Sequence, residues 1–431
     1  MPVVERTPVP SVEGQGLPVG TPIRSFILTD DSSPGMACQV INLGATLSHL
    51  WVRDNSQKGI RDVVLGFDDL TAYRSKHDPY FGASVGRTAN RIANGQFTLP
   101  DNPTFVYQLD KNNGPNSLHG GVDGFSFRIW DVELPSAKQS SKGTSLQFRL
   151  LSDHLDQGFP GRLCVYCTYR LHDYALEISY HAYIDGLVGD RLGETTIVSL
   201  TNHAYFNLNG VPNVGRNPSP HSKTPAPIST VENHILNTYG IESYLETDST
   251  SVPTGRVLSL DQVPAMDFRK AKAVGQDLAQ TPGGGHGYDH FYLLQVATAL
   301  PSKYLQKDGH QETSSRLVAS VYSPESGIEM KVSTTDPGFQ LYTANSVKLD
   351  PNVIDCDTLS EEVNPGFGPT IRYIGKARGG YSPHSALCLE ASRFPDAINH
   401  PSWRDQVLLR LGEEYRSTVT FAFSTKESNS V

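Results

Sequence analysis

The chain has 431 residues, of which 38% are hydrophobic and 9% aromatic, so it can bury a large core and is neither disordered nor a small disulfide-stabilised protein. The formal charge is -9 at pH 7, and lysine and arginine form no continuous run. This balance argues against a nucleic-acid-binding protein, which would need a basic surface for the phosphate backbone.

The first 21 residues contain early charges and several prolines where a secretory signal peptide needs an apolar run. We therefore expect a flexible N-terminal arm over residues 1–21, followed by the folded part of the chain over residues 22–426. No apolar stretch is long enough for a transmembrane helix, so we expect no membrane partner. The five cysteines are odd in number and scattered, which suits a reducing compartment, and we expect a cytoplasmic protein.

Short runs of β-branched and aromatic residues, bounded by Gly, Pro, Asn and Asp, recur along the chain, whereas helical periodicity is hard to find. Their spacing predicts an all-β protein, either a sandwich or a barrel. Residues 323–327 lie between two alternating runs and predict a hairpin loop with Gly at the tight position. Polar stretches rich in Gly and Pro predict loop excursions at residues 134–144, 211–226, 300–314 and 351–383.

Two polar clusters occur in the first third of the chain, at residues 86–95 and 113–121. We place both in loops or at strand ends. Taken alone, each cluster is read either as a turn or as part of a ligand site, because Gly, Asn and Pro at this density mark turns in any protein.

Cys164 and Cys167 form a C-x-x-C pair within a run that reads as a strand. Their odd spacing points the two thiols to opposite faces of a sheet. No second pair completes a zinc site, so we expect no metal or redox role here.

An alternating segment from Thr196 to Leu208 places a row of hydrogen-bonding side chains, including His203, on one face and mostly apolar ones on the other. Such a row fits a ligand site better than an ordinary solvated sheet. A structural or surface histidine remains the alternative.

His286 and His290 lie four residues apart, a spacing that chelates zinc on a helix. The glycines before them and the aromatic run after them indicate a strand instead, where positions four apart are about 13 Å from each other. One metal ion cannot take both, so we expect a polar ligand contact from Asp289 rather than a metal site.

Glu390 ends the apolar run Ala386-Leu387-Cys388-Leu389 and continues the face of Ala386 and Cys388. It is either a salt-bridged strand end or a partly desolvated general base, since burial tunes the pKa of a carboxyl group.

Seven motifs, taken in order along the chain, resemble those of the aldose 1-epimerase family. They are Gly86–Ile92, Asn116–Gly121, Thr201–Leu208, Pro253–Gly255, Tyr288–His290, Pro337–Asn345, and Cys388–Glu390 followed by Phe394–Asn399. The resemblance spans roughly residues 22–424 and implies one domain, a single large twisted β-sandwich of the galactose mutarotase-like supersandwich type, with the sugar on one sheet face. One departure is visible, because Ala391-Ser392 stand where the family commonly has Thr-Gln beside the glutamate.

Carried over position by position, the resemblance assigns His203 as general acid and Glu390 as general base. The groups implied to hold the sugar hydroxyls are Asn90, Arg91, His119, Asp289 and Gln340. The implied substrate is a free aldose such as D-galactose or D-glucose, with no cofactor and no metal, in a monomer or homodimer.

The implied reaction opens the sugar ring and closes it on the other face, so it needs one acid and one base and transfers no electrons. Because His203 must be protonated to act as the acid, we expect its pKa near the working pH, with help from Asp289.

Three rival functions remain at this stage. A glycoside hydrolase would use Asp289 and Glu390 as its carboxylate pair. An epimerase of hexose 6-phosphates would need a basic cluster that the sequence does not reveal. A non-catalytic sugar-binding module would have no use for both His203 and Glu390.

Overall fold

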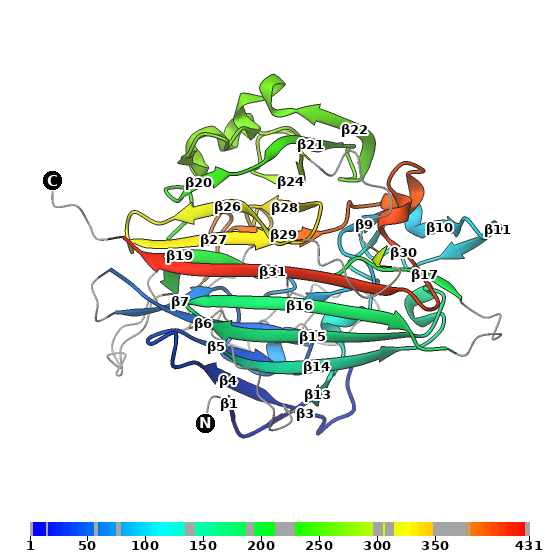
Figure 1. Cartoon of the computed structure of the whole chain (residues 1–431), viewed down its shortest axis with the longest axis horizontal. Helices are drawn as coiled ribbons and strands as arrows, with labels where there is room; N and C mark the ends of the chain where they lie inside the picture. The colour runs from blue at the N-terminus through cyan, green and yellow to red at the C-terminus, as the bar shows by residue number, and fades with distance from the viewer. Residues whose placement is uncertain are drawn as a thin grey trace, which may run out of the picture.

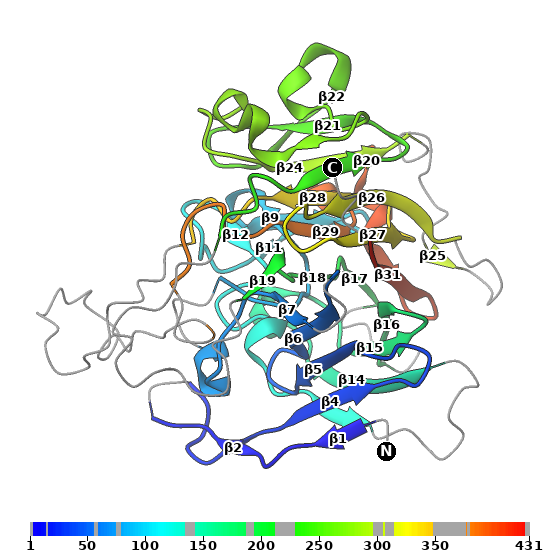
Figure 2. The same cartoon turned by 90° about the vertical axis from the view of Figure 1, so that its left-hand side faces the viewer.

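The computed structural model describes residues 3–13, 16–55, 59–74, 79–133, 143–186, 194–211, 229–295, 305–306, 314–347, 376 and 380–426. Within these ranges the chain is built of β-strands and short 3₁₀ turns (Figures 1 and 2), which confirms the all-β prediction. No helix in the described ranges has the length and apolar character needed to cross a membrane.

A ten-stranded sheet forms one layer of the molecule (Figure 1). Its order is β13 (Asp131–Glu133), β14 (Thr144–Ser152), β15 (Leu163–His172), β16 (Ala175–Ile184), β31 (Glu414–Thr425), β27 (Ile328–Thr334), β26 (Arg316–Tyr322), β20 (Ile235–Thr238) and β23 (Lys272–Ala273), with β25 (Leu305–Gln306) pairing with β31.

Two further sheets complete the main architecture. The six-stranded sheet has the order β1 (Val3–Glu5), β4 (Ser25–Thr29), β5 (Ala37–Ile41), β6 (Thr46–Arg53), β7 (Ile60–Val64) and β19 (Phe206–Val211). The five-stranded sheet has the order β22 (Pro253–Ser259), β21 (Ile241–Thr247), β24 (Asp289–Leu294), β28 (Gly338–Tyr342) and β29 (Cys388–Ser392).

Short paired strands and single turns connect these sheets. The pairs are β2 (Val9–Pro10) with β3 (Pro22–Ile23), β8 (Ser84–Val85) with β18 (Thr201–Asn202), β9 (Arg91–Ile92) with β12 (Ser117–Leu118), β10 (Gln96–Leu99) with β11 (Asn102–Gln108), and β17 (Thr195–Ile197) with β30 (Leu408–Arg410). The 3₁₀ turns are η1 (Leu70–Arg74), η2 (Ala93–Gly95), η3 (Phe125–Phe127), η4 (Asp156–Gly158), η5 (Leu260–Gln262), η6 (Pro264–Met266), η7 (Val274–Gln280), η10 (Ala397–Asn399) and η11 (Arg404–Gln406).

The ten-stranded and six-stranded sheets face each other across a shared core. Along β14, buried and half-buried residues alternate strictly, as expected for a strand with one face toward the core. Phe148 of β14 meets Phe26 of β4 edge to face at 6.3 Å between ring centroids, and Phe421 of β31 meets Phe206 of β19 at 4.7 Å. This packing confirms the predicted sandwich.

The hairpin predicted at residues 323–327 is present between β26 and β27. Gly327 has φ 71°, and its N–H donates to the carbonyl of Ser323 at 2.9 Å. A Cβ at Gly327 would come within 2.6 Å of the Asn55 side chain, so glycine is needed both for the turn and for space.

Two expectations about chain segments differ from the structure. In the described part of residues 1–21, β1 pairs with β4 and β2 pairs with β3, so a free arm is wrong for these strands. The segment Thr196–Leu208 is divided among β17, β18 and β19 and is buried on both faces, because the β18 link is covered by residues 82–85. The four predicted loop excursions fall largely outside the described residues.

The two thiols of the C-x-x-C pair lie on opposite faces of β15, as expected. Cys164 accepts a hydrogen bond from Arg149 Nε at 3.5 Å, whereas Cys167 contacts the Ser84 hydroxyl at 3.5 Å inside the core. Both are free cysteines.

A buried ion pair ties the five-stranded sheet to the ten-stranded one. Asp336, just before β28, pairs with Arg393, just after β29, and both side chains are almost completely buried. Asp336 also accepts from the Ser417 hydroxyl of β31 at 2.5 Å, and Arg393 donates to the Arg416 carbonyl at 3.0 Å. These contacts hold the ends of β28 and β29 against the large sheet.

Replacing either partner of this pair will destabilise the fold strongly, because the other charge is left buried without compensation. For Arg393→Ala we expect a loss of about 3–5 kcal/mol in the free energy of unfolding, measured by urea titration. The control is Arg256→Ala, which breaks an ion pair with Glu246 at a position where Arg256 is 69% exposed and should cost less than about 1 kcal/mol. Equal losses in the two variants would contradict this account.

Candidate active site

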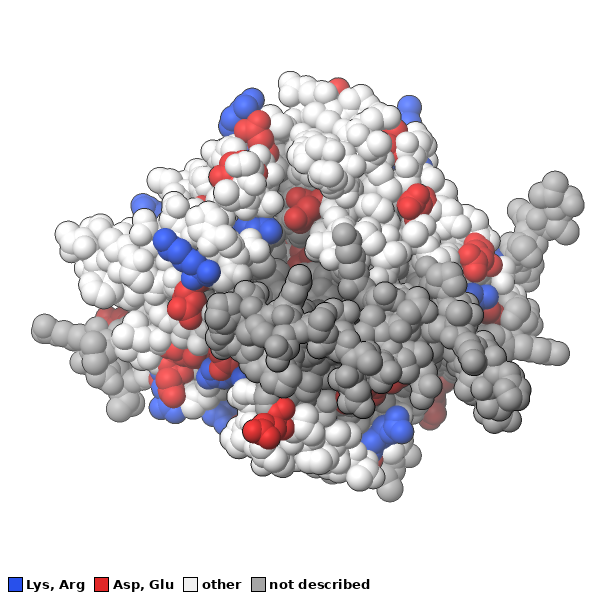
Figure 3. Space-filling view, turned by 180° about the vertical axis from the view of Figure 1, so that it is seen from behind, with Lys and Arg blue, Asp and Glu red and all other residues white. Residues whose placement is uncertain are grey.

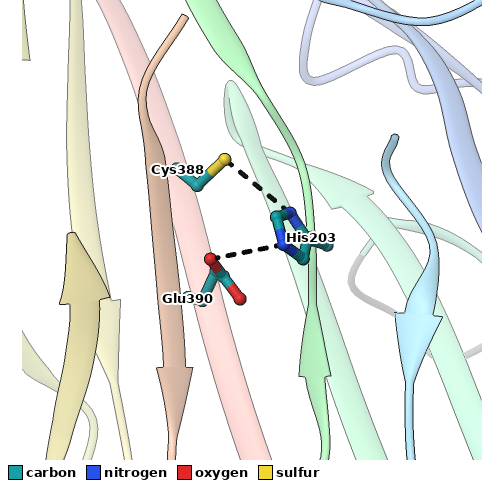
Figure 4. Close-up of side chains that lie close together, drawn as sticks. All are labelled: His203, Cys388 and Glu390. Carbon is teal, nitrogen blue, oxygen red and sulfur yellow. Dashed lines mark hydrogen bonds and ion pairs between the residues drawn. The ribbon is translucent and has the colours of Figure 1, made fainter. Parts of the chain in front are cut away.

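The centre of the site is a contact between His203 and Glu390, in which Nε2 and Oε1 lie 3.6 Å apart (Figure 4). His203 lies between β18 and β19, and its backbone is held by bonds to Gly82 and Ala83 at 2.9 Å each. Glu390 is the middle residue of β29. Each side chain is only 6% exposed, so both groups meet in a nearly dry environment.

A two-bond bridge joins the strands that carry these residues. Phe206 and Leu387 each donate a backbone N–H to the other's carbonyl, at 2.8 and 2.9 Å. Phe206 is three residues after His203, and Leu387 is three residues before Glu390. The bridge therefore fixes the spacing of the acid and base candidates across the boundary between two sheets.

Cys388 is the third member of this group. It shares a strand face with Glu390, and its Sγ lies 3.7 Å from His203 Nδ1 (Figure 4). One potential metal-ligand atom from each of the three residues lies within 4.8 Å of the other two.

Asp289, Gln340 and Glu390 form a polar row across β24, β28 and β29. Gln340 is paired directly with Glu390, and its Nε2 donates to Asp289 Oδ1 at 2.7 Å. Directly paired residues and those two apart share one face of an antiparallel sheet, so all three side chains project from the same side. The amide thus fixes the orientation of the Asp289 carboxylate beside Glu390.

On the other side of the site, Asn90, Arg91 and His119 are held together by their own backbone. The N–H of Asn90 donates to His119 Nδ1 at 3.1 Å, and the N–H of Arg91 donates to Asn90 Oδ1 at 2.8 Å. An acceptor Nδ1 requires a neutral ring whose hydrogen is on Nε2. Burial, together with the nearby His203 and Arg91, lowers the pKa of His119 well below its usual value, which agrees with a neutral ring.

Asp396 clamps the same segment from the C-terminal part of the chain. Its Oδ1 accepts from the N–H of Ala93 at 3.0 Å, and its own N–H donates to the carbonyl of Arg91 at 3.1 Å. The next amide, of Asn94, donates to Asn116 Oδ1 at 3.0 Å. Side chains distant in sequence therefore satisfy the backbone that follows the short strand β9 of Arg91.

Aromatic rings surround His203. Tyr205 stacks on one side at 4.9 Å between ring centroids, and Tyr80 stacks at 6.1 Å. His119 approaches edge-on at 5.3 Å. The Tyr205 hydroxyl donates to the Pro79 carbonyl at 3.0 Å, which links the histidine to the turn that carries Tyr80.

Burial shifts both central groups toward their neutral forms. It lowers the pKa of His203 to about 4, so the expected pKa near the working pH is wrong. Burial and the charge of Asp289 raise the pKa of Glu390 well above its usual value, and Arg91 opposes them. Asp289 therefore acts on the glutamate rather than on the histidine. At a pH between the lowered pKa of His203 and the raised pKa of Glu390, the two side chains together hold one exchangeable proton.

The structure brings the seven residues predicted from the sequence into one connected set. His203 meets Glu390, which pairs with Gln340 and through it with Asp289. His119 contacts the His203 ring and bonds to the segment of Asn90 and Arg91. The Ser392 hydroxyl, at the departure from the family pattern, donates to the Arg393 carbonyl at 3.0 Å.

Three contributors were not assigned from the sequence. Cys388 could have been found from the alternation that it shares with Glu390, and Asp396 lies in a motif that was recognised without a role. Tyr80 carried no signal, because its place beside His203 depends on a turn with φ 65° that packs against distant strands.

Comparisons with known proteins show the family of the chain. The family model described as aldose 1-epimerase matches residues 27–422. The chain belongs to the aldose 1-epimerase family. It is 36% identical to a galactose mutarotase of Bos taurus over 411 residues, covering 95% of this chain and 96% of the relative. It is 31% identical to an aldose 1-epimerase of Escherichia coli (strain K12), covering 94% and 96%.

Solved structures show the same fold. An aldose epimerase homologue from C. elegans superposes with a TM-score of 0.67 at 25% identity, covering 93% of this chain and 98% of that one. A galactose 1-epimerase from Lactobacillus acidophilus gives 0.66 at 22% identity and 98% coverage of both chains, which supports the fold alone. The expected family, the enzyme class and the mutarotase-like sandwich are thus confirmed.

We expect Asp396→Ala to weaken sugar binding and stability together, because it leaves the half-buried Ala93 amide without its acceptor. The loss of stability should be about 1–3 kcal/mol by urea titration, and KM should rise several-fold. Asp396→Asn keeps an oxygen acceptor and should lie close to the original protein in both measurements. A harmless alanine variant would show that the clamp does not hold Arg91 in place.

Proposed function

We propose that the protein interconverts the α and β anomers of a free aldose, with His203 and Glu390 as the proton-transferring pair. The supporting observation is the buried contact of 3.6 Å between Nε2 and Oε1. The anomeric carbon of a sugar bears two oxygens, the hydroxyl and the ring oxygen. An acid and a base at this spacing can address both oxygens of one bound sugar.

In the opening step, Glu390 takes the proton of the anomeric hydroxyl while the C1–O5 bond breaks and a carbonyl forms at C1. His203 gives its proton to O5. Rotation about C1–C2 then presents the other face of the aldehyde. In closure, O5 returns its proton to His203 and attacks C1, and the carbonyl oxygen takes the proton back from Glu390. Atoms and protons balance, and no group is lost.

The pKa values affect this mechanism through the proton shared by the pair. In the resting site burial favours a protonated Glu390 and a neutral His203. The opening step starts from the other allocation, with the proton on His203 and a carboxylate at Glu390. Both allocations contain one proton and no net charge, so exchange between them requires no uptake or release of protons.

The remaining site residues are proposed to hold the sugar hydroxyls. Arg91 and the Nε2–H of His119 are donors, the Asp289 carboxylate is an acceptor, and Asn90 and Gln340 carry amides that do both. Asn90, Arg91 and Asp289 are half-buried, whereas His119 and Gln340 are buried. A site with many hydroxyl contacts discriminates between sugars through single unpaired polar groups.

D-Galactose and D-glucose are the proposed substrates, because several relatives are named galactose mutarotases. Lys/Arg and Asp/Glu side chains are interspersed over the described part of the face in Figure 3. We further propose a cytoplasmic protein, since the described cysteines are free. A monomer or homodimer is the proposed assembly.

The first test is polarimetry of freshly dissolved α-D-glucose and α-D-galactose, with the spontaneous rate as baseline. Glu390→Gln and His203→Gln should each lower kcat by about 10²–10⁴-fold while the unfolding midpoint changes little, because each removes one proton transfer. Hexose 6-phosphates serve as a control substrate. Unchanged rates in both variants would overturn the assignment of the pair.

The pH profile of kcat/KM should be bell-shaped around the one-proton state. Below the lowered pKa of His203, about 4, the ring takes a second proton and no base remains. Above the raised pKa of Glu390 the pair loses its proton and no acid remains. Asp289→Asn should move the alkaline limb to lower pH, and Arg91→Met should move it to higher pH. If both variants shifted the alkaline limb in the same direction, Glu390 would not be the group whose titration causes that limb.

A further inference from the structure

Cys388 is a buried side chain that the proposed mechanism does not use. It is fully buried in β29, and its Sγ faces the Nδ1 of His203 at 3.7 Å, opposite the nitrogen that faces Glu390 (Figure 4). Sulfur forms weak hydrogen bonds, and a thiol can donate or accept. The position of its hydrogen therefore depends on which nitrogen of the ring is protonated.

The shared proton lies either on Glu390 or on His203, and in both states Nδ1 of His203 carries a hydrogen. When Glu390 is protonated, its hydroxyl faces Nε2, so Nε2 is the acceptor and the ring hydrogen lies on Nδ1. When the proton has moved to His203, both nitrogens carry hydrogens. Nδ1 is therefore a donor in both allocations, and the atom opposite it has to accept.

We propose that Cys388 is a positioning residue that accepts the Nδ1 hydrogen of His203 and thereby keeps Nε2 available for proton exchange with Glu390. This inference rests on the proposed function of the pair. Tyr205 and Tyr80 restrict the tilt of the His203 ring by stacking, but stacking does not favour either tautomer of the imidazole. A hydrogen-bond acceptor at Nδ1 favours the tautomer with its hydrogen on Nδ1.

A neutral sulfur suits a reaction that runs in both directions. Burial and the charges of Glu390 and Asp289 raise the pKa of the Cys388 thiol well above its usual value, so it remains a neutral thiol. A carboxylate at this place would stabilise the imidazolium and hold the proton on His203. A weak neutral acceptor leaves both allocations accessible, which matches the exchange of acid and base roles between opening and closure.

Other titratable or charged groups also face the pair from the surrounding elements. They are Glu390 on β29, Tyr342 on β28, Asp289 on β24, Tyr205 after β18, His119 after β12, Arg91 on β9, and Tyr80. Of the side-chain contacts given for His203, that of Cys388 is the one made to Nδ1. The ring also has a hydrogen bond to its own backbone, which raises the pKa of His203 against the effect of burial.

The test combines Cys388→Ala and Cys388→Ser with steady-state kinetics and ¹⁵N NMR of the His203 ring in the full-length protein. In the original protein the ring should be protonated at Nδ1 at pH 7. Cys388→Ala should move the equilibrium toward the Nε2-protonated form and lower kcat about fivefold to tenfold with KM unchanged, as expected for one weak hydrogen bond. Cys388→Ser supplies a hydroxyl acceptor and should restore most of both signals.

Cys38→Ala is the matched control, because Cys38 is equally buried but lies in the core on β5. It should show a similar loss of stability with unchanged kcat and unchanged histidine signals. An Nε2-protonated ring in the original protein, or original kcat and ring signals in Cys388→Ala, would overturn the proposal for Cys388. Activity that persists in Glu390→Gln would instead overturn the proposed function, so the two failures are distinguishable.

Discussion

The contact between His203 and Glu390 depends on the exclusion of water, and much of the structure around it serves to maintain that condition. In bulk water the two groups would titrate near their ordinary values and the histidine would not be neutral at pH 4 to 6. Here each side chain is 6% exposed, and burial drives both toward their neutral forms. The pair then behaves as one unit with a single proton, which is the state that the proposed ring opening needs.

The two sides of the site are built on different physical principles. Glu390, Gln340 and Asp289 stand on adjacent strands, where the register of the sheet sets their spacing. Arg91 begins the two-residue strand β9, Asn90 precedes it and His119 follows its partner β12, and side chains such as Asp396 supply the hydrogen bonds beyond this short ladder. The side of Glu390, Gln340 and Asp289 is therefore held rigidly by the backbone hydrogen bonds of the sheet. The position of the other side depends on individual hydrogen bonds from side chains.

Local pattern was enough to predict the strands, the 323–327 hairpin and the exceptional place of Glu390, because period-two alternation and turn chemistry are properties of neighbouring residues. The family motifs supplied the seven site residues together. The pairing of β1 with β4 and the division of Thr196–Leu208 were missed, since both depend on partners distant in sequence. The pKa of His203 was missed for the same reason: its cause is burial by side chains from several other segments.

The backbone bridge between Phe206 and Leu387 makes the distance between His203 and Glu390 depend on how the two sheets lie against each other. His203 precedes a strand of the six-stranded sheet and Glu390 belongs to the five-stranded one, so the proposed acid and the proposed base lie on opposite sides of the boundary between two sheets. A displacement of one sheet along the other changes the distance between them directly, without disturbing either sheet internally. The catalytic rate should therefore depend on the relative position of the two sheets. A mutation far from the site lowers the rate when it shifts one sheet against the other.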